Sequence, residues 1–411
     1  MALQWRNESG HCLSGSYLYN MARRIATGID IGTHQVKVVV VEEVRDSQGP
    51  GLRIIGTGVS DTAGMRHGYV VDVDDVAESI RRAKHQAEQI ARTPIKSGFL
   101  AIGGISLDET RGTGTAIISR ADAEITELDI EKAQESARQA ASPAFLNRRI
   151  LHEIPLGWTV DGVKSLGEPL GMKGTRLEGD FLFITCLESH ADALTNAVEN
   201  ADIEVVDCMA SPLAGSYVTL AKDQKMKGCV LANIGAETVS IVVYDEGVPI
   251  SLKVFPSGSS SITDDLALGF KVSLEDAERI KLGRLSGAMY PRKRVDDIMG
   301  ARFKGMFDLI DKHLKAIGKR GALPAGIILS GGGAGQGSIS DIAKGSLSLP
   351  SRIADIKVAP DAKIKDATWA VAYGLALWGL TGEMSGSGGG GKASLAGMKT
   401  SLTRFFRQFL P

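Results

Sequence analysis

The sequence predicts an α/β fold in which a β-β-β-α unit occurs twice around a shared cleft, with a small α/β subdomain inserted in the first copy. The segments IATGIDIG (25–32) and VLANIG (230–235) each resemble a strand that ends in glycine and is followed by a second strand. Asp30 and Asn233 are 203 residues apart, and so are the glycines two positions further on. A constant offset of this kind indicates an internal repeat.

Each copy shows three strand patterns and one helix pattern, followed later in the chain by one further strand. In the first copy we expect strands at 25–32, 36–44 and 52–59, a helix capped by Asp74 or Asp75 that runs up to Pro94, and a strand at 98–104. In the second copy we expect strands at 230–235, 239–244 and 250–255, a helix from about Ser261, and a strand at 325–329.

Residues 105–180 do not fit the repeat and are expected to form the inserted subdomain, with strands near 114–118 and 149–155 and a helix at 129–141. The first core subdomain is expected to consist of residues 23–104, 181–222 and 364–381, with the insertion at 105–180. The second core subdomain is expected to consist of residues 223–262 and 322–363, with an outer subdomain at 263–321. An N-terminal extension (1–22), which is expected to be disordered because it lacks a fold pattern, precedes them, and a flexible linker (382–398) and an amphipathic helix (399–411) follow.

Composition excludes several classes of protein. The longest apolar runs are strand-sized, so a membrane-spanning helix of about 20 residues is not expected. The 47 basic and 48 acidic residues nearly cancel, so a nucleic-acid partner is not expected. Four widely spaced cysteines form no metal motif and favour a reducing compartment. The first 20 residues lack the pattern of a secretory signal, and we expect Met21 to be the physiological start.

Three glycine-rich turns are expected to meet at the cleft. In the first, DIGTHQVK, Gly32 lets a ligand approach the backbone, while Thr33 and His34 offer amides and a hydroxyl group. Lys37 interrupts an apolar strand, where a charge needs a partner, so we expect it to reach a phosphate or to pair with Asp30.

The second and third turns have related compositions. The second, NIGAETVS, supplies Asn233, Gly235, Ala236, Glu237 and Thr238. The third, LSGGGAGQG, follows a strand and supplies Gly331, Gly332 and Gly333. Glycines at the carboxyl end of a strand commonly receive the phosphates or sugar of a nucleotide, so the three turns together predict a nucleotide site.

The motifs DIGT, NIGAET and SGGGAG resemble the two phosphate loops and the adenosine loop of the actin, hexokinase and chaperone ATPase superfamily. The resemblance implies an actin-like fold, built of ribonuclease H-like domains, that binds ATP, with Mg²⁺ held through water by Asp30. The segment EDAERIKL (275–282) resembles the helix that contacts the ribose in this superfamily, with Glu278 and Lys281 on one face.

Within the superfamily, the chain most resembles the FtsA family of bacterial cell-division proteins. The resemblance runs from about residue 25 to residue 380, continues into the C-terminal tail, and rests on GIDIGTHQVKVVVVE, FPSGSSSITDDLALGFKVSLEDAERIKL, GIILSGGGAGQGSISDIA and the position of the insertion. It implies a filament that assembles from copies of the chain, binds the C-terminal peptide of FtsZ and other divisome proteins, and works peripherally on the cytoplasmic face of the inner membrane at the division site. Arg302 falls where the family has an arginine in the peptide pocket, although Gly305 and Met306 stand where an acidic residue is expected.

The second phosphate loop departs from the family pattern Asp-x-Gly-Gly-Gly-Thr-Thr. Asn233 replaces the carboxylate, and Ala236 and Glu237 replace two glycines. Two like charges about 4 Å apart repel by roughly 4 kcal/mol at an effective dielectric constant of about 20, so Glu237 would oppose a γ-phosphate unless it turned outward. We therefore expect weak or absent ATP hydrolysis and no catalytic residues.

The last residues predict an amphipathic helix that binds membrane lipids. Its apolar face consists of Leu402, Phe405, Phe406, Phe409 and Leu410, and its basic side chains include Arg404 and Arg407. A last helix that docks on its own domain is the alternative, although the preceding flexible linker argues against it. Two other readings of the whole chain remain open: a pilus-assembly scaffold like PilM, which typically lacks such a tail, and a small-molecule kinase, which needs a catalytic carboxylate in the cleft.

Overall fold

The computed structural model describes residues 23–46, 49–287, 289–336, 338–356, 364 and 366–383. The predicted N-terminal extension at 1–22, nearly all of the predicted linker and the predicted amphipathic helix at 399–411 lie outside these ranges. What is predicted for those segments therefore stays a prediction.

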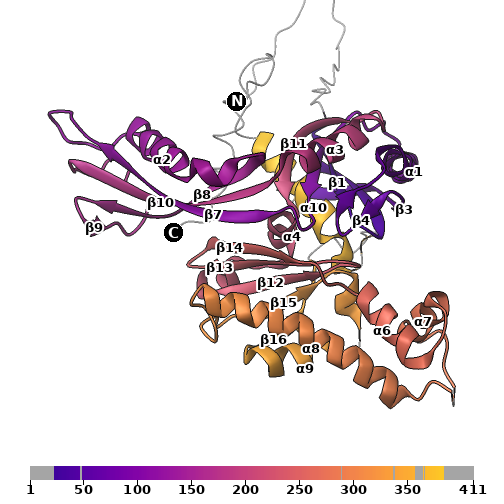
Figure 1. Cartoon of the computed structure of the whole chain (residues 1–411). Helices are drawn as coiled ribbons and strands as arrows, with labels where there is room; N and C mark the ends of the chain where they lie inside the picture. The colour runs from indigo at the N-terminus through magenta and orange to yellow at the C-terminus, as the bar shows by residue number, and fades with distance from the viewer. Residues whose placement is uncertain are drawn as a thin grey trace, which may run out of the picture.

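Two five-stranded sheets with the same topology form the centre of the molecule (Figure 1). The first has the order β11-β6-β1-β2-β3, and the second has the order β16-β15-β12-β13-β14. The strands of the first sheet are β1 (Ile25–Ile31), β2 (Gln35–Asp46), β3 (Gly49–Asp61), β6 (Ser97–Ile102) and β11 (Glu204–Ala210). Those of the second sheet are β12 (Cys229–Ile234), β13 (Val239–Asp245), β14 (Val248–Phe255), β15 (Ile327–Ser330) and β16 (Ser351–Ile353).

The register of the two sheets repeats with the spacing found in the sequence. Asp30 of β1 lies opposite Lys37 of β2, and Asn233 of β12 lies opposite Ser240 of β13. In each sheet the first strand also pairs in parallel with a strand that comes later in the chain, β6 or β15. The predicted duplication of a β-β-β-α unit is confirmed.

Helices α4 (Ser211–Thr219) and α10 (Ala370–Glu383) lie between the two sheets, and α8 (Arg292–Ala316) and α9 (Ile339–Leu347) cover the opposite face of the second sheet (Figure 1). The contact between α10 and β1 is very close, since a Cβ atom on Gly28 would lie 1.9 Å from the carbonyl oxygen of Ala372. The remaining helices of the two halves are α1 (Val73–Ala91), α3 (Glu188–Glu199), α5 (Lys222–Lys227), α6 (Ser260–Phe270) and α7 (Leu274–Lys281), with short 3-10 segments η2 (Gly332–Gly335) and η3 (Ala367–Trp369).

Helix α1 begins two or three residues earlier than predicted from the sequence. Asp72, and not Asp74 or Asp75, is the N-cap residue, because its Oδ1 accepts hydrogen bonds from the backbone N–H groups of Asp74 (3.0 Å) and Asp75 (3.1 Å). The helix ends at Arg92, whose left-handed conformation (φ 52°) turns the chain before Pro94.

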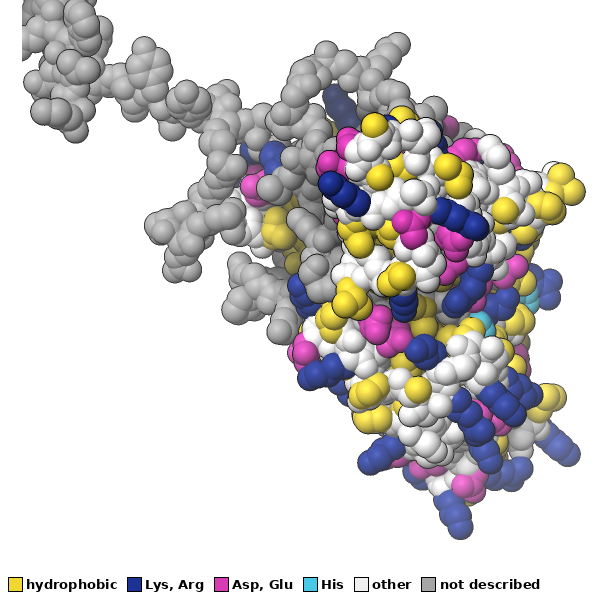
Figure 2. All heavy atoms as spheres, turned by 90° about the vertical axis from the view of Figure 1, so that its left-hand side faces the viewer, with side chains coloured by type: hydrophobic (Ala, Val, Ile, Leu, Met, Phe, Trp, Pro, Cys, Tyr) yellow, Lys and Arg dark blue, Asp and Glu magenta, His cyan; other side chains and the backbone are white. Residues whose placement is uncertain are grey.

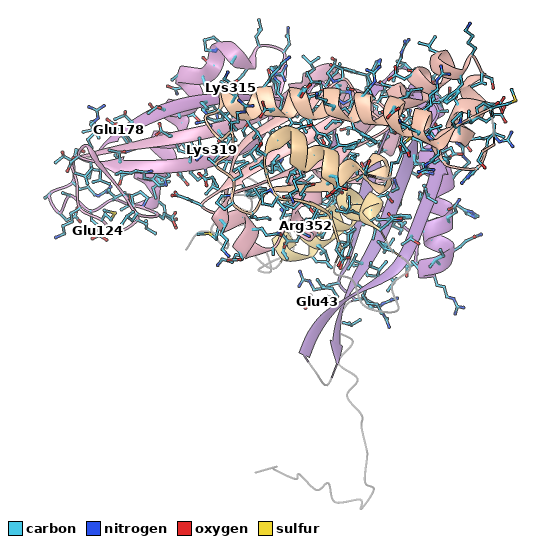
Figure 3. The ribbon with its side chains drawn as sticks, turned by 90° about the horizontal axis from the view of Figure 1, so that it is seen from below. Glu43, Glu124, Glu178, Lys315, Lys319 and Arg352 are labelled. Carbon is cyan, nitrogen blue, oxygen red and sulfur yellow. The ribbon has the colours of Figure 1, made fainter. Side chains whose placement is uncertain are left out.

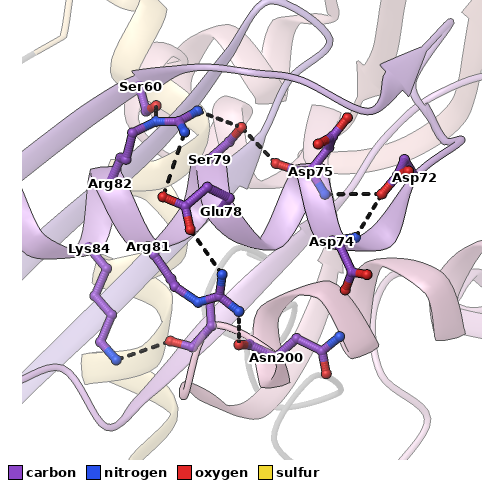
Figure 4. A network of polar contacts seen from close by, with 11 residues as sticks. Ser60, Asp72, Asp74, Asp75, Glu78, Ser79, Arg81, Arg82, Lys84 and Asn200 are labelled. Atoms are coloured by element: carbon purple, nitrogen blue, oxygen red, sulfur yellow. Dashed lines mark hydrogen bonds and ion pairs between the residues drawn. The ribbon is translucent and has the colours of Figure 1, made fainter.

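Basic side chains of α1 bind the end of α3 (Figure 4). Arg81 donates to the carbonyl oxygen of Asn200 (2.8 Å), and Lys84 donates to those of Ala201 and Asp202 (both 3.0 Å). These carbonyl groups lie at the C-cap of α3 and in the turn that follows it, so the contacts give them partners and fix the end of α3 against α1.

The insertion is a four-stranded sheet, with the order β7-β10-β8-β9, that projects from the first half (Figure 1). Its elements are β7 (Asp108–Ile117), α2 (Glu127–Ala141), η1 (Ser142–Phe145), β8 (Arg148–Val160), β9 (Val163–Lys164) and β10 (Arg176–Leu187). Helix α2 packs on one face of the sheet, where Gly114 lets the backbone of Ala133 come close. The boundary drawn at residue 180 falls inside β10, which pairs with β7 and β8 along its whole length.

The insertion also contacts the second half, at the outer edge of β14. The carboxylate of Glu109, on β7, accepts hydrogen bonds from the hydroxyl group of Ser251 (2.8 Å) and from the backbone N–H of Leu252 (2.6 Å). Arg111 donates to the carbonyl oxygen of Ile250 at 2.9 Å. We call this contact the Glu109 brace, because it joins the insertion of the first half to the second half.

Charged side chains are scattered over the face shown in Figure 2, and many Lys and Arg side chains lie on its lower part. Seen from below in Figure 3, Lys315 and Lys319 lie at the end of α8, while Glu124 and Glu178 lie on the insertion. Lys319 forms an ion pair with Asp245 of β13 (2.5 Å), which holds the end of α8 against the sheet. Within the described ranges, no helix combines the length and apolar composition needed to cross a membrane.

Replacement of Gly28 tests the contact between β1 and α10. The added methyl group of Gly28→Ala would overlap the backbone of α10, so we expect the free energy of unfolding to fall by about 1–3 kcal/mol or more. Gly157→Ala in β8 is the matched control, because nothing lies within 4 Å of its Cβ position. Urea unfolding of both variants measures the difference, and equal midpoints would contradict the prediction.

Candidate functional site

A cavity lies between the two sheets, and both copies of the repeat line it. Eleven residues predicted from the three glycine turns line this cavity: Asp30, Gly32, Thr33, His34, Lys37, Asn233, Gly235, Ala236, Thr238, Gly331 and Gly332. The three turns therefore meet at one place in the described structure.

The first two turns have the same backbone geometry. The N–H of Gly32 donates to the carbonyl oxygen of Gln35 (3.0 Å), and the N–H of Gly235 donates to that of Thr238 (2.9 Å). A Cβ atom at either glycine would lie only 3.0 or 3.1 Å from the same carbonyl oxygen, so the tight turn favours glycine. Each turn presents backbone to the cavity from its own half of the molecule.

The third turn closes the cavity from the side of β15. Gly331 has a positive φ of 86°, and a Cβ atom there would lie 2.3 Å from Oδ1 of Asn233, so glycine is required for two reasons. Gly332 has nothing within 4 Å of its Cβ position and leaves room for a ligand. Gly333 is absent from the residues that line the cavity and packs against Ile234, which gives it a structural position.

Asp30 and Lys37 carry opposite charges on neighbouring strands at the base of the cavity. Burial raises the pKa of the Asp30 carboxyl to about 6, although the positive charge of Lys37 acts in the opposite direction. Asp30 is the only carboxylate among the described residues that line the cavity. In the described part of the chain, no three His, Cys, Asp or Glu side chains are grouped to hold a metal ion.

Glu237 turns away from the cavity. Its carboxylate accepts a hydrogen bond from the backbone N–H of His67, and Nδ1 of the His67 ring lies 3.5 Å from the same oxygen. The predicted repulsion between Glu237 and a γ-phosphate therefore does not apply to this conformation.

Glu278 and Lys281 share one face of α7, as their spacing predicted. The ammonium group of Lys281 lies 2.6 Å from Oε2 of Glu278, and the Thr263 hydroxyl donates to the same oxygen at 2.6 Å. Burial opposes ionisation of Glu278, but the hydrogen bonds from Lys281 and Thr263 lower its pKa. These two side chains do not line the first cavity. Lys281 lines a second cavity with Gly335 and Gln336, which lie in the last part of the third turn.

Several residues that line the first cavity were not singled out from the sequence. They include Gly68, Gly103, Gly104, Ser211, Ser259 and Thr368. The segment GFLAIGG was recognised as a strand, and its final glycine pair carried the same signal as the other turns. Gly68, Ser211 and Thr368 enter the site only through tertiary packing, so no local pattern identifies them.

Arg302 lies outside the cavity, on α8 in the outer part of the second half. Its guanidinium forms two hydrogen bonds with Asp265 of α6, from Nε to Oδ2 (2.7 Å) and from Nη2 to Oδ1 (2.6 Å). The arginine side chain is 38% exposed, so it remains accessible beside its partner.

Comparisons with known proteins place this geometry in a family. The model described as "SHS2 domain inserted in FTSA" matches residues 109–185, and that described as "Cell division protein FtsA" matches residues 230–406. The cell-division protein FtsA of Borreliella burgdorferi is 30% identical over 357 residues, which cover 81% of this chain and 85% of the relative. The chain belongs to the FtsA family of cell-division proteins. FtsA of Pseudomonas aeruginosa is 28% identical over 387 residues, covering 88% of this chain and 91% of the relative.

Solved structures confirm the predicted actin-like fold of this FtsA family member. The PilM–PilN type IV pilus biogenesis complex has a chain that matches with a TM-score of 0.66 at 18% identity, covering 86% of this chain and 98% of that one. MreB5 of Spiroplasma citri bound to ADP matches with a TM-score of 0.51 at 12% identity, covering 89% and 99%. At these identities the similarity shows the fold alone. The FtsA family match therefore favours the cell-division protein over the PilM-like scaffold and the small-molecule kinase.

The buried carboxyl of Asp30 should make the stability of this FtsA family member depend on pH. Its pKa is about 6 in the folded chain and about 3.9 in an unfolded one, so the stabilisation that it contributes is complete below pH 4 and is lost as the pH rises through 6. Relative to Asp30→Asn, the free energy of unfolding of the wild type should fall by about 1–3 kcal/mol between pH 4 and pH 7. Denaturant unfolding at both pH values measures this difference, and parallel pH profiles would contradict it.

Proposed function

We propose that this chain is an ATP-binding, self-assembling adaptor that tethers FtsZ filaments to the cytoplasmic membrane and helps to assemble the divisome. The meeting of three glycine turns at one cavity between two duplicated sheets carries the nucleotide part of the proposal. Membership of the FtsA family supports the cell-division part.

The residues of the cavity fit a nucleoside triphosphate. The turns at Gly32 and Gly235 expose backbone N–H groups from opposite sides, an arrangement that suits the oxygens of a phosphate chain. Lys37 supplies a positive charge at the base. The second cavity, beside Lys281 and Gly335, would receive the nucleoside, with Glu278 and Lys281 near the ribose.

A magnesium ion would be held through water. Mg²⁺ often keeps several waters and binds to one or two carboxylates together with the phosphates, and Asp30 is the carboxylate available for this in the described cavity. The ion would neutralise phosphate charge, while Asp30 would orient its water shell.

Hydrolysis is expected to be weak or absent. The second turn carries Asn233 in place of a carboxylate, and Glu237 faces His67 instead of the cavity. A general base must come within hydrogen-bonding reach of the attacking water, and neither side chain supplies one. Nucleotide would therefore serve assembly more than turnover.

Arg302 is the candidate contact for the C-terminal peptide of FtsZ. Its bidentate pair with Asp265 holds the guanidinium in a fixed orientation at the surface between α6 and α8. On the same helix as Asp265, three residues further on, Leu268 is 79% exposed. An accessible arginine beside an exposed leucine fits a peptide that carries both an acidic and an apolar side chain.

The tail would provide the membrane contact. The FtsA family model matches up to residue 406, which includes most of the predicted amphipathic helix. Burial of five large apolar side chains gives roughly 7–15 kcal/mol, and ordering about eleven residues offsets most of it. A single tail would thus bind weakly, and a filament carrying many tails would bind firmly through avidity.

Removal of the tail should abolish membrane binding. We expect the full chain, with ATP, to sediment with vesicles that contain anionic lipid, and a chain ending at Gly382 to remain in the supernatant. A chain with Phe405→Ser and Phe409→Ser is the matched control, because it keeps the length and the charges while losing the apolar face. Equal sedimentation of the full and shortened chains would defeat the membrane part of the proposal.

Filling the first cavity should weaken nucleotide binding. Gly332→Val places a side chain in the open space of the third turn, and we expect the Kd for ATP to rise about tenfold or more. Gly345→Ala in α9, which also has nothing within 4 Å of its Cβ position, is the control. Calorimetric titration measures the Kd.

A phosphate-release assay tests the prediction of weak or absent hydrolysis. We expect release by the wild type to stay near the background rate. Vigorous turnover that Asp30→Ala abolishes would overturn the prediction.

A further inference from the structure

A short hairpin of the first half reaches the mouth of the cavity. Strands β4 (Met65–Arg66) and β5 (Tyr69–Val70) are joined by His67 and Gly68, with φ angles of 50° and 81°. Two successive residues with positive φ are typical of the tight two-residue turn that matches the twist of a hairpin. The turn therefore has a defined shape and presents the backbone of His67 outward.

The hairpin rests firmly on the loop that follows β6. Gly68 lies against Gly104, because a Cβ atom on Gly68 would be 2.4 Å from Cα of Gly104. The ring of Tyr69 packs at 4.9 Å from that of His190, whose Nε2 lies 3.2 Å from the carbonyl oxygen of Gly103. Gly68, Gly103 and Gly104 all line the first cavity, so the hairpin forms part of its wall.

The tip of this hairpin is bound to the other half of the molecule by Glu237. The carboxylate of Glu237 accepts the backbone N–H of His67, with the imidazole ring nearby. The turn that carries Glu237 is itself held by two backbone hydrogen bonds, from Ser259 to Gly235 (2.9 Å) and from Ser260 to Ala236 (2.7 Å). The carboxylate of Glu237 thus links the β4–β5 hairpin of the first half to the second glycine turn of the other half.

We propose that Glu237 is a positioning residue that holds hairpin β4–β5 over the phosphate end of the cavity and so slows nucleotide exchange. The residues on either side of Glu237 line the cavity, and Gly68 lines it from the opposite half. Separation of the two halves must break the hydrogen bond between Glu237 and His67 before a nucleotide leaves. The effect on nucleotide exchange rests on the proposed nucleotide site. The hydrogen bond by which Glu237 fixes the hairpin does not depend on that site.

Hydrogen exchange of the nucleotide-free, full-length chain tests the hold on the hairpin. Glu237→Gln keeps the shape and an acceptor oxygen but removes the charge. Because a hydrogen bond to a charged group is stronger than one to a neutral group, we expect the backbone amides of residues 65–70 to exchange up to about tenfold faster. His67→Gly keeps the N–H and the positive φ and removes the ring, so a change of only about twofold is expected. Glu131→Gln, at an exposed position of α2, is the control. Unchanged exchange at 65–70 in Glu237→Gln would overturn the proposal.

Dissociation of the fluorescent nucleotide mant-ATP, followed by stopped flow, tests the consequence for exchange. We expect Glu237→Gln to release mant-ATP about tenfold faster than the wild type and than Glu131→Gln. Faster hydrogen exchange of the hairpin with an unchanged release rate would overturn the gating role of Glu237. A wild-type chain that binds no mant-ATP would overturn the proposed nucleotide site instead, while the hydrogen exchange still decides whether Glu237 holds the hairpin.

Discussion

Two backbone hydrogen bonds set the geometry on which the cleft depends, one from Gly32 to Gln35 and one from Gly235 to Thr238. Each bond closes a tight turn between the first two strands of a repeat and fixes how those strands pair. Because the pairing of the first two strands is the same in both copies, the two turns occupy equivalent positions at the ends of two sheets with the same topology. The shared cavity follows from this repetition, since neither sheet alone encloses a site.

The two copies have the same strand pairing but carry different charges at equivalent positions. Asp30 and Lys37 occupy one pair of opposite positions, while Asn233 and Ser240 occupy the equivalent pair in the second sheet. All the ionisable chemistry at the base of the cavity therefore comes from the first copy. The second copy contributes backbone, an amide and a glycine loop. Groups of this kind can bind an anion without a change in their own protonation.

Much of this architecture could be predicted from the sequence, because glycine turns and helix periodicity are patterns of neighbouring residues and the repeat shows as a constant offset of 203 residues. The predicted start of α1 was two or three residues too late, since Asp72, Asp74 and Asp75 are equally good caps in sequence and only the backbone conformation selects Asp72. Gly333 looked like its neighbours but packs on Ile234. The contact of Glu237 with His67 joins residues 170 positions apart, and no periodicity encodes such a pair.

The Glu109 brace bears on whether the insertion is a separable module. Strand β14 is the outermost strand of its sheet, and such an edge offers unpaired backbone groups to any passing strand. Glu109 and Arg111 occupy the Leu252 N–H and the Ile250 carbonyl on that edge. Excision of the insertion would expose these groups to other chains, so the subdomain also protects the second half from unwanted strand pairing. We therefore expect the sequences of the insertion and of β14 to co-vary in evolution. Another subdomain put in place of the insertion would have to cover the edge of β14 as well.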